Sequence, residues 1–183
     1  MSFDVYKCFL PECNLDTLLV EILLQKTFSV NHQKGNSSIA VKMDGKLLRN
    51  SFAVGIIDED KVKLKSLENF IEIKRLTKKG LKFFKHADPQ RHHYFIQICP
   101  AIEKWILIES GKGKIDIANE RYKLPDTLSG LVSLKSASQR DDQRFSLLFL
   151  DMLKNKNCDE IIALKKWLLF LKKHNYKSNI DLL

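Results

Sequence analysis

The stretch SFAVGIID, residues 51–58, decides the fold that this sequence predicts. Its apolar run, Phe52 to Ile57, is bounded by polar residues, as is typical of a strand that is covered on both faces. Such a strand belongs in the centre of a parallel sheet. The run ends on three acids in a row, Asp58, Glu59 and Asp60, which repel one another and favour neither a core nor a strand.

The segments around this strand alternate between strand and helix. We expect a strand at 5–10 that ends at Pro11, then an amphipathic helix at 14–26 with Asn14 as its N-cap. The other expected elements are a helix from Ser37 or Ser38 to about residue 47, a strand pair at 69–73 and 81–86, a strand at 93–99, a helix that opens with Pro100, and helices at 141–154 and 158–174. This order predicts an α/β fold with a largely parallel sheet flanked by helices. Residues 1–123 are expected to form the α/β core, and residues 124–183 a helical C-terminal extension packed on the same domain.

The composition is that of an ordinary globular protein of 183 residues, long enough for one domain with a core. The N-terminus lacks the basic and apolar regions of a secretory signal, and the apolar runs are shorter than the ~20 residues that a membrane span needs. The four cysteines show neither a CxxC pair nor zinc-ligand spacing. We therefore expect a soluble, cytoplasmic protein with reduced thiols and no membrane partner.

The net charge of +9 is concentrated in two segments. Residues 61–93 hold ten Lys and Arg against three acids, and residues 154–177 hold seven Lys against two acids. Such segments attract polyanions, so one interpretation is contact with the nucleic-acid backbone by Lys61, Lys63 and Lys65, with Lys34 steadying a phosphate from a nearby loop. The other interpretation, equally open on charge alone, is a solvated surface that keeps the protein soluble.

Acids follow three of the expected strands. Glu12 comes after the first strand, Asp58 and Asp60 after the central one, and Glu103 lies in the first turn of the helix that follows the strand at 93–99. Functional sites of such sheets lie beyond the carboxyl ends of the strands, where these acids would gather. In an extended chain Asp58 and Asp60 point the same way, which suits Mg²⁺, a cation that prefers carboxylate oxygens and water.

Simpler explanations exist for each acid taken singly. An acid at a strand end often marks only where the strand meets water, and Glu103 suits a helix dipole. By the same reasoning Asp16 is a helix-start residue and Glu59 a solvated bystander. The joint occurrence at corresponding strand ends favours a functional site.

These residues carry a resemblance. A strand, Glu12, an E-x-x-x-D spacing to Asp16, a helix and an apolar strand ending in D-x-D resemble the TOPRIM (topoisomerase–primase) domain, in particular small stand-alone bacterial members related to overcoming-lysogenization-defect nucleases. The resemblance covers roughly residues 5–110. It implies a Rossmann-like sheet that binds Mg²⁺ or Mn²⁺, with Glu12 as general acid/base and Asp58 and Asp60 as metal ligands. It also implies that Glu103 is a third carboxylate at the metal.

The chain departs from the family pattern in one place. The family usually has glycine directly after its glutamate, where this sequence has Cys13. Nor does the chain carry a tyrosine in a topoisomerase setting, a zinc-binding domain or an ATPase domain, so we do not expect a topoisomerase or a full primase.

Three functions remain open at this point. The first is a Mg²⁺-dependent nuclease or related phosphodiester-processing enzyme. The second is a non-catalytic module that binds nucleic acid or a partner such as an ATPase in a defence system. The third is a phosphatase with an aspartyl nucleophile, although Lys61-Val62 follow the D-x-D here in place of the Gly-Thr of the haloacid-dehalogenase group.

Overall fold

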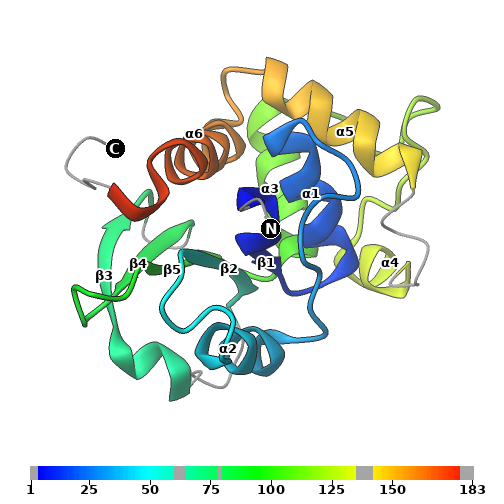
Figure 1. The fold of residues 1–183 in the computed structure, drawn as a ribbon. Coiled ribbons are helices and arrows are strands. Elements are labelled where there is room, and N and C mark those ends of the chain that lie inside the picture. The colour runs from blue at the N-terminus through cyan, green and yellow to red at the C-terminus, as the bar shows by residue number, and fades with distance from the viewer. Residues whose placement is uncertain (1–3, 60–64, 78–79, 135–141, 178–183) are drawn as a thin grey trace.

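A computed structural model of the chain describes residues 4–59, 65–77, 80–134 and 142–177 (Figure 1). One five-stranded sheet lies between helices, with the strands in the order β1-β2-β5-β4-β3. The strands are β1 (Phe9–Pro11), β2 (Ala53–Asp58), β3 (Phe70–Arg75), β4 (Lys82–His86) and β5 (His93–Ile98). The helices are α1 (Asn14–Leu24), α2 (Asn36–Asp44), α3 (Ile102–Gly113), α4 (Leu128–Ser133), α5 (Gln143–Lys154) and α6 (Asp159–His174). Short 3₁₀ turns cover Val5–Cys8 (η1), Lys65–Asn69 (η2) and Asn175–Lys177 (η4).

The sheet is mixed, which corrects the expectation of a largely parallel one. β2 runs parallel to both of its neighbours, β1 and β5. β4 pairs antiparallel with β5, and β3 pairs antiparallel with β4. The strand pair predicted at 69–73 and 81–86 is confirmed, and two strands joined by a short turn must pair antiparallel. The α/β class and the flanking helices are also confirmed.

β2 is the central strand that its apolar run predicts. All six of its residues are buried between β1 and β5. Gly55 allows α2 to approach this strand closely, because a Cβ there would overlap the ring of Phe95 and lie 2.9 Å from Cγ2 of Ile39. Burial on both faces explains why the sequence is continuously apolar and does not alternate.

The two faces of the sheet are covered unequally (Figure 1). On one face lies α2, which packs Ile39 and Met43 in a small core with Phe95. The other face is covered by α1, α3, α5 and α6, which build the large core together with the sheet. Phe145 and Trp167, from the predicted C-terminal extension, belong to that large core. None of the helices in the described ranges is both long and apolar enough to cross a membrane.

The first strand differs from its prediction. Residues 5–8 form a 3₁₀ turn because the Asp4 side chain accepts a hydrogen bond from Tyr6 N. The free edge of β1 is covered by the segment 31–35, in which Asn31 N donates to Phe9 O at 2.9 Å and Gln33 N to Pro11 O at 2.9 Å. β1 therefore has backbone hydrogen-bond partners on both sides, β2 on one and the segment 31–35 on the other.

A buried polar network joins α3 to α6. Glu109, which is fully buried, accepts hydrogen bonds from the backbone N–H groups of Glu160 and Ile161 at the start of α6. Glu160 in turn accepts from the indole Nε1 of Trp105 at 2.8 Å. The half-buried ammonium of Lys112 lies 2.6 Å from Glu109 and 3.1 Å from Glu160. Because both carboxylates are buried, this one cation balances charge that water cannot reach.

Candidate functional site

Glu12 and Asp58 meet at the carboxyl edge of the sheet. β1 and β2 run in parallel register, with Pro11 opposite Ile56, so their ends lie side by side. Glu12 N donates to Ile56 O at 3.0 Å, which continues this pairing by one residue. The Oε2 atom of Glu12 accepts a hydrogen bond from Asp58 N at 3.1 Å. The structure thus brings together the two acids that the strand ends predicted to be neighbours.

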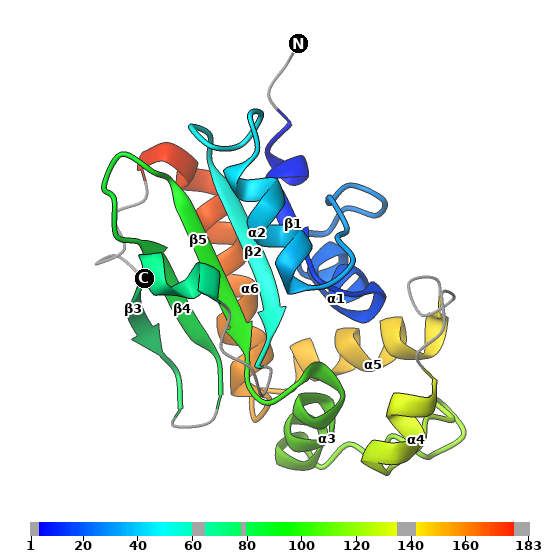
Figure 2. The same cartoon turned by 90° about the horizontal axis from the view of Figure 1, so that it is seen from below.

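Asp58 also holds the start of α3. Its Oδ1 atom accepts a hydrogen bond from Ile102 N at 3.0 Å, the first residue of the helix. Figure 2 shows α3 beginning just beyond the ends of β2 and β5. Glu103, the next residue, lies in the first turn and is only 1% exposed. Asp58 therefore connects the end of the central strand to the helix that carries Glu103.

Asp16 is a fourth acid at this edge. It forms a capping box with Cys13, in which Oδ2 of Asp16 accepts from Cys13 N and Sγ of Cys13 accepts from Asp16 N. The expected N-cap, Asn14, is wrong by one residue, while the helix-start role of Asp16 is confirmed. Its second oxygen, Oδ1, is buried and has no hydrogen-bond partner among the described residues. A buried carboxylate oxygen without a partner is costly, which marks a place where a proton or cation is favoured.

Burial and the charge of neighbouring acids together raise the pKa of Asp58. Burial, and then the like charges of Asp16, Glu12 and Glu103, raise the pKa of Asp58 to about 9. The hydrogen bond from Ile102 N opposes this shift but does not outweigh it. At neutral pH the Asp58 carboxyl therefore holds its proton unless a cation takes the proton's place.

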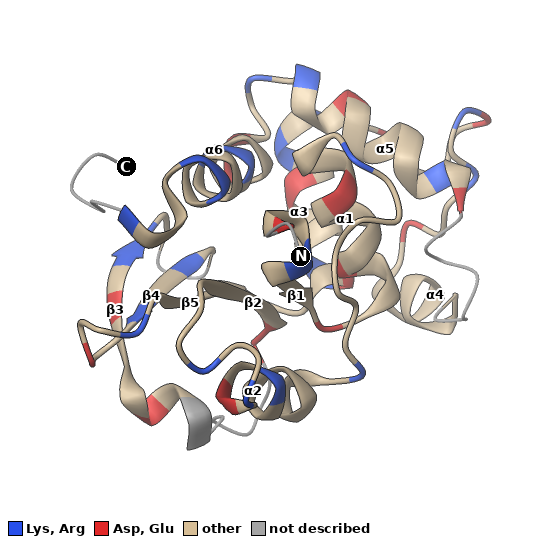
Figure 3. Ribbon diagram, in the orientation of Figure 1, with Lys and Arg blue, Asp and Glu red and all other residues tan. Residues whose placement is uncertain are grey.

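Asp16 is shifted in the same direction. Burial raises its pKa to about 7, and the charges of Glu12 and Glu103 add to that effect, whereas the hydrogen bonds with Cys13 oppose it. The pKa of Asp16 thus responds to two of the acids that also act on Asp58. These four carboxylates, from the end of β1, the end of β2 and the first turns of α1 and α3, form the acid cluster (Glu12, Asp16, Asp58 and Glu103). Figure 3 shows acidic segments at the end of β2 and within α1 and α3, with basic residues along α6.

Cys13 fits the turn without the glycine that the resemblance leads one to expect. Its backbone lies in the extended region, at φ −127° and ψ 175°, which any residue adopts. Burial, followed by the charge of Asp16, raises the pKa of its thiol well above the usual range. The side chain therefore acts as a neutral helix cap next to the acids.

As a metal site the acid cluster has suitable donors but no preformed cage. Carboxylate oxygens are the ligands that Mg²⁺ and Mn²⁺ prefer. Over the described ranges, however, no three side chains of His, Cys, Asp or Glu come close enough together to hold an ion as they stand. Asp60, the second acid of the D-x-D, lies outside the described residues. Glu59, by contrast, forms an ion pair with Lys82 and is 42% exposed, as a bystander would be.

Of the lysines predicted to contact nucleic acid, Lys34 can be placed. It is exposed, and its neighbour Gly35 donates from its backbone N to Glu12 O at 3.2 Å. Lys34 therefore adjoins a residue, Gly35, that is hydrogen-bonded to the backbone of Glu12 in the acid cluster. Lys61 and Lys63 lie outside the described residues, as does the side chain of Lys65.

Sequence reasoning missed that Asp16 belongs with the other acids. The E-x-x-x-D spacing from Glu12 was the available signal. Because a helix-start role was enough to explain Asp16, its second oxygen was not considered as part of the site. Comparison with known proteins adds nothing to this geometry: no family model, no curated protein and no solved structure matches the chain.

Proposed function

We propose that this protein is a Mg²⁺- or Mn²⁺-dependent phosphodiester-processing enzyme, a nuclease of the TOPRIM class. The observation that carries the proposal is the acid cluster, in which burial and like charge raise the pKa of Asp58 to about 9 and of Asp16 to about 7. The fold buries Asp16, Asp58 and Glu103 beside Glu12, and the raised pKa values mean that negative charge at this sheet edge is disfavoured unless a divalent cation balances it. A divalent cation can supply the charge stabilisation that phosphodiester hydrolysis needs.

Within this proposal each acid has a role. Asp58, Asp60 and Glu103 would hold the ion, and the second oxygen of Asp16, which is buried without a hydrogen-bond partner among the described residues, would be a further donor. When bound, a divalent ion polarises the phosphate and stabilises the charge that develops on it. Glu12 is the general acid/base, and the hydrogen bond from Asp58 N fixes its carboxylate next to the ligands.

The proposed partner is the nucleic-acid backbone, in DNA or RNA. Lys34 precedes Gly35, whose backbone N donates to Glu12 O, and Figure 3 marks further Lys and Arg positions on β3, β4 and α6. Lysine suits this task because it attracts phosphate as a point charge without reading bases.

Metal-dependent cleavage tests the proposal directly. Purified protein is incubated with labelled single- and double-stranded DNA and RNA, with Mg²⁺, with Mn²⁺ or with EDTA. We expect cleavage with either metal and none with EDTA, and a loss of at least 100-fold in Asp58→Asn and Glu12→Gln. Glu59→Gln is the matched control, since Glu59 adjoins Asp58 but pairs with Lys82. Cleavage by Asp58→Asn at the parental rate would overturn the proposal.

A second candidate is a non-catalytic binding module, with an ATPase as one proposed partner. The observation in its favour is that three of the four acids also hold backbone N–H groups, so folding alone gives them a use. This candidate predicts salt-sensitive binding of nucleic acid or of a partner protein that survives Asp58→Asn unchanged, with no cleavage by the parent protein under any metal condition.

A further inference from the structure

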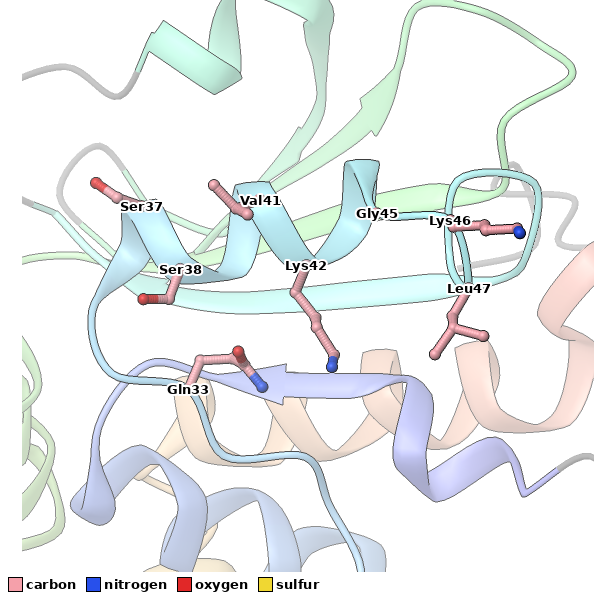
Figure 4. A pocket seen from close by; sticks show the side chains of 8 residues that line it. All are labelled: Gln33, Ser37, Ser38, Val41, Lys42, Gly45, Lys46 and Leu47. Carbon is pink, nitrogen blue, oxygen red and sulfur yellow. The ribbon is translucent and has the colours of Figure 1, made fainter.

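A surface groove of about 480 Å³ runs along α2, on the side of the helix that faces the segment 31–35 (Figure 4). Ile39 and Met43 point into the core, which leaves Ser38 and Lys42, four residues apart, on an outer face. In Figure 4 the side chains of Lys42 and Gln33 point into the same space from opposite walls. Leu47 closes the far end.

The charge of this groove has one sign. Lys42 and Lys46 line it, and no Asp or Glu is found among the described residues that do. Asp44, the acid nearest in sequence, forms an ion pair with Arg91. Hydroxyl groups of Ser37 and Ser38 and the amide of Gln33 complete the polar lining. These groups suit a polymeric ligand that carries both anionic and hydrogen-bonding groups.

The groove also offers apolar surface to a ligand. Val41 is 73% exposed and Leu47 is 80% exposed, and both line it beside the lysines. In a double helix the bases are stacked inside, whereas a single strand presents both its bases and its phosphates to a protein. A volume of this size lies in the range of small-ligand pockets, which suits a single nucleotide unit and not a duplex.

One end of the groove adjoins the acid cluster. Gln33, which lines the groove, belongs to the segment 31–35 that is hydrogen-bonded to the end of β1, since Gln33 N donates to Pro11 O and Gly35 N to Glu12 O. From that end α2 extends for nine residues, or ~13 Å at 1.5 Å per residue.

We infer that the α2 groove binds single-stranded nucleic acid and leads it to the acid cluster. Lys42 and Lys46 contact phosphates, while Val41 and Leu47 contact bases or sugars. The inference rests on the proposed function for what happens at the cluster, but the binding itself needs no metal and no chemistry. It names single-stranded nucleic acid as the substrate class of the site.

Binding in EDTA separates the groove from the chemistry. Fluorescence anisotropy with labelled 12-residue oligo-dT and oligo-U measures affinity for the parent protein and for the double variant Lys42→Glu, Lys46→Glu. Both lysines are exposed, so the fold is retained, and thermal unfolding checks this. We expect affinity to fall at least tenfold, and the slope of log K against log salt to decrease in magnitude by about 1 to 2.

The matched control is Lys114→Glu, Lys123→Glu, which changes the net charge equally on exposed residues outside the groove and outside both basic segments. Its affinity should stay within about twofold of the parent. Equal loss in both double variants would overturn the groove and leave only a general charge effect. A 12-residue poly-glutamate peptide that binds the groove as tightly as the oligonucleotides would also overturn it, in favour of an acidic protein partner.

The failures of the two proposals are distinguishable. If the parent cuts nucleic acid and the groove variant binds and cuts as well as the parent, the groove inference fails and the proposed function stands. If the groove variant loses binding but the parent never cuts with any metal, the proposed function fails and the groove stands.

Discussion

The side chain of Glu12 accepts a hydrogen bond from the backbone N–H of Asp58 at 3.1 Å, across 46 positions of sequence. This contact joins the ends of two parallel strands through a side chain, beyond the last bond of the backbone ladder. Burial and the charge of Asp16 raise the pKa of Asp58 most, and the charge of Glu12 adds to them. The residue whose side chain orders the sheet edge therefore also contributes to the electrostatic character of the candidate site.

Two substitutions at Asp58 separate its structural and chemical roles. Asp58→Asn keeps an oxygen for Ile102 N, so we expect a thermal unfolding temperature at or above that of the parent, but no stabilisation by Mg²⁺ or Mn²⁺. Asp58→Ala leaves that buried N–H without its acceptor, at a cost of about 1–3 kcal/mol. Differential scanning fluorimetry with and without metal measures both effects. Equal metal stabilisation of the parent and Asp58→Asn would remove Asp58 from the ion site.

Neutralising Asp16 should lower the pKa of Asp58. Asp16 is the charged group that most raises it, so in Asp16→Asn we expect the carboxyl of Asp58 to titrate below its parental value of about 9. Carbon-detected NMR of the side-chain carboxyl over pH 4 to 10 follows this titration. Asp44→Asn is the control, because Asp44 lies in α2 and pairs with Arg91. An unchanged Asp58 titration in Asp16→Asn would contradict the cluster.

Stability should fall as the pH rises. The folded pKa of Asp58, about 9, lies above its ordinary value of 3.8, so between these limits the folded protein holds a proton that the unfolded chain has lost. The free energy of unfolding therefore decreases with increasing pH across this window, by up to ~1.4 kcal/mol per pH unit for this one proton. Urea titrations at pH 5, 7 and 9 measure the slope, which should be shallower in Asp58→Asn. A slope that is the same in the parent and the variant would show that Asp58 ionises freely in the fold.

Divalent metal should oppose that loss of stability. Protons and metal compete for the same oxygens, so Mg²⁺ or Mn²⁺ at about 5 mM should raise the unfolding temperature more at pH 8.5 than at pH 6. The same scans on Glu59→Gln should reproduce the parent, since Glu59 is paired with Lys82. A metal effect that is independent of pH, or equally large in Asp58→Asn, would place binding outside the acid cluster.

Removing Lys112 should destabilise the protein independently of any ligand. Its ammonium lies within 3.1 Å of Glu109, Asp159 and Glu160, of which Glu109 and Glu160 are buried. Lys112→Met leaves this charge unbalanced, and we expect a loss of roughly 3–5 kcal/mol in urea unfolding. Lys114→Met, two residues along at an exposed position, should change stability by less than about 0.5 kcal/mol.

Most elements of the fold could be predicted because their patterns are local. A few neighbouring residues are enough to indicate helix or strand in the apolar run at 52–57, in the segments with helical periodicity and in the strand pair. The mixed character of the sheet depends instead on where the hairpin docks, which is decided by packing against β5 and leaves no mark in the periodicity. The start of β1 was missed because a single side chain, that of Asp4, converts the segment 5–8 into a 3₁₀ turn.

The candidate site could be predicted in part for a similar reason. Parallel strands present their ends at one edge, so Glu12 and Asp58 were expected together, and they meet. From the sequence, capping the start of α1 is a sufficient reason for an acid at Asp16. Only the fold shows that its second oxygen is buried without a hydrogen-bond partner among the described residues. The α2 groove left no motif in the sequence, because Gln33 and Lys42 face each other only once the chain turns from the segment 31–35 into α2.

The hydrogen bonds that Glu12, Asp16 and Asp58 make to backbone N–H groups have an evolutionary consequence. Selection for folding alone would preserve these three acids in a related chain whether or not that chain cuts nucleic acid. Lys42 and Lys46 carry no such obligation, since among the described residues neither has an ion pair. In a lineage without the proposed nucleic-acid ligand, the groove lysines would therefore be replaced by other residues while the acids remained in place.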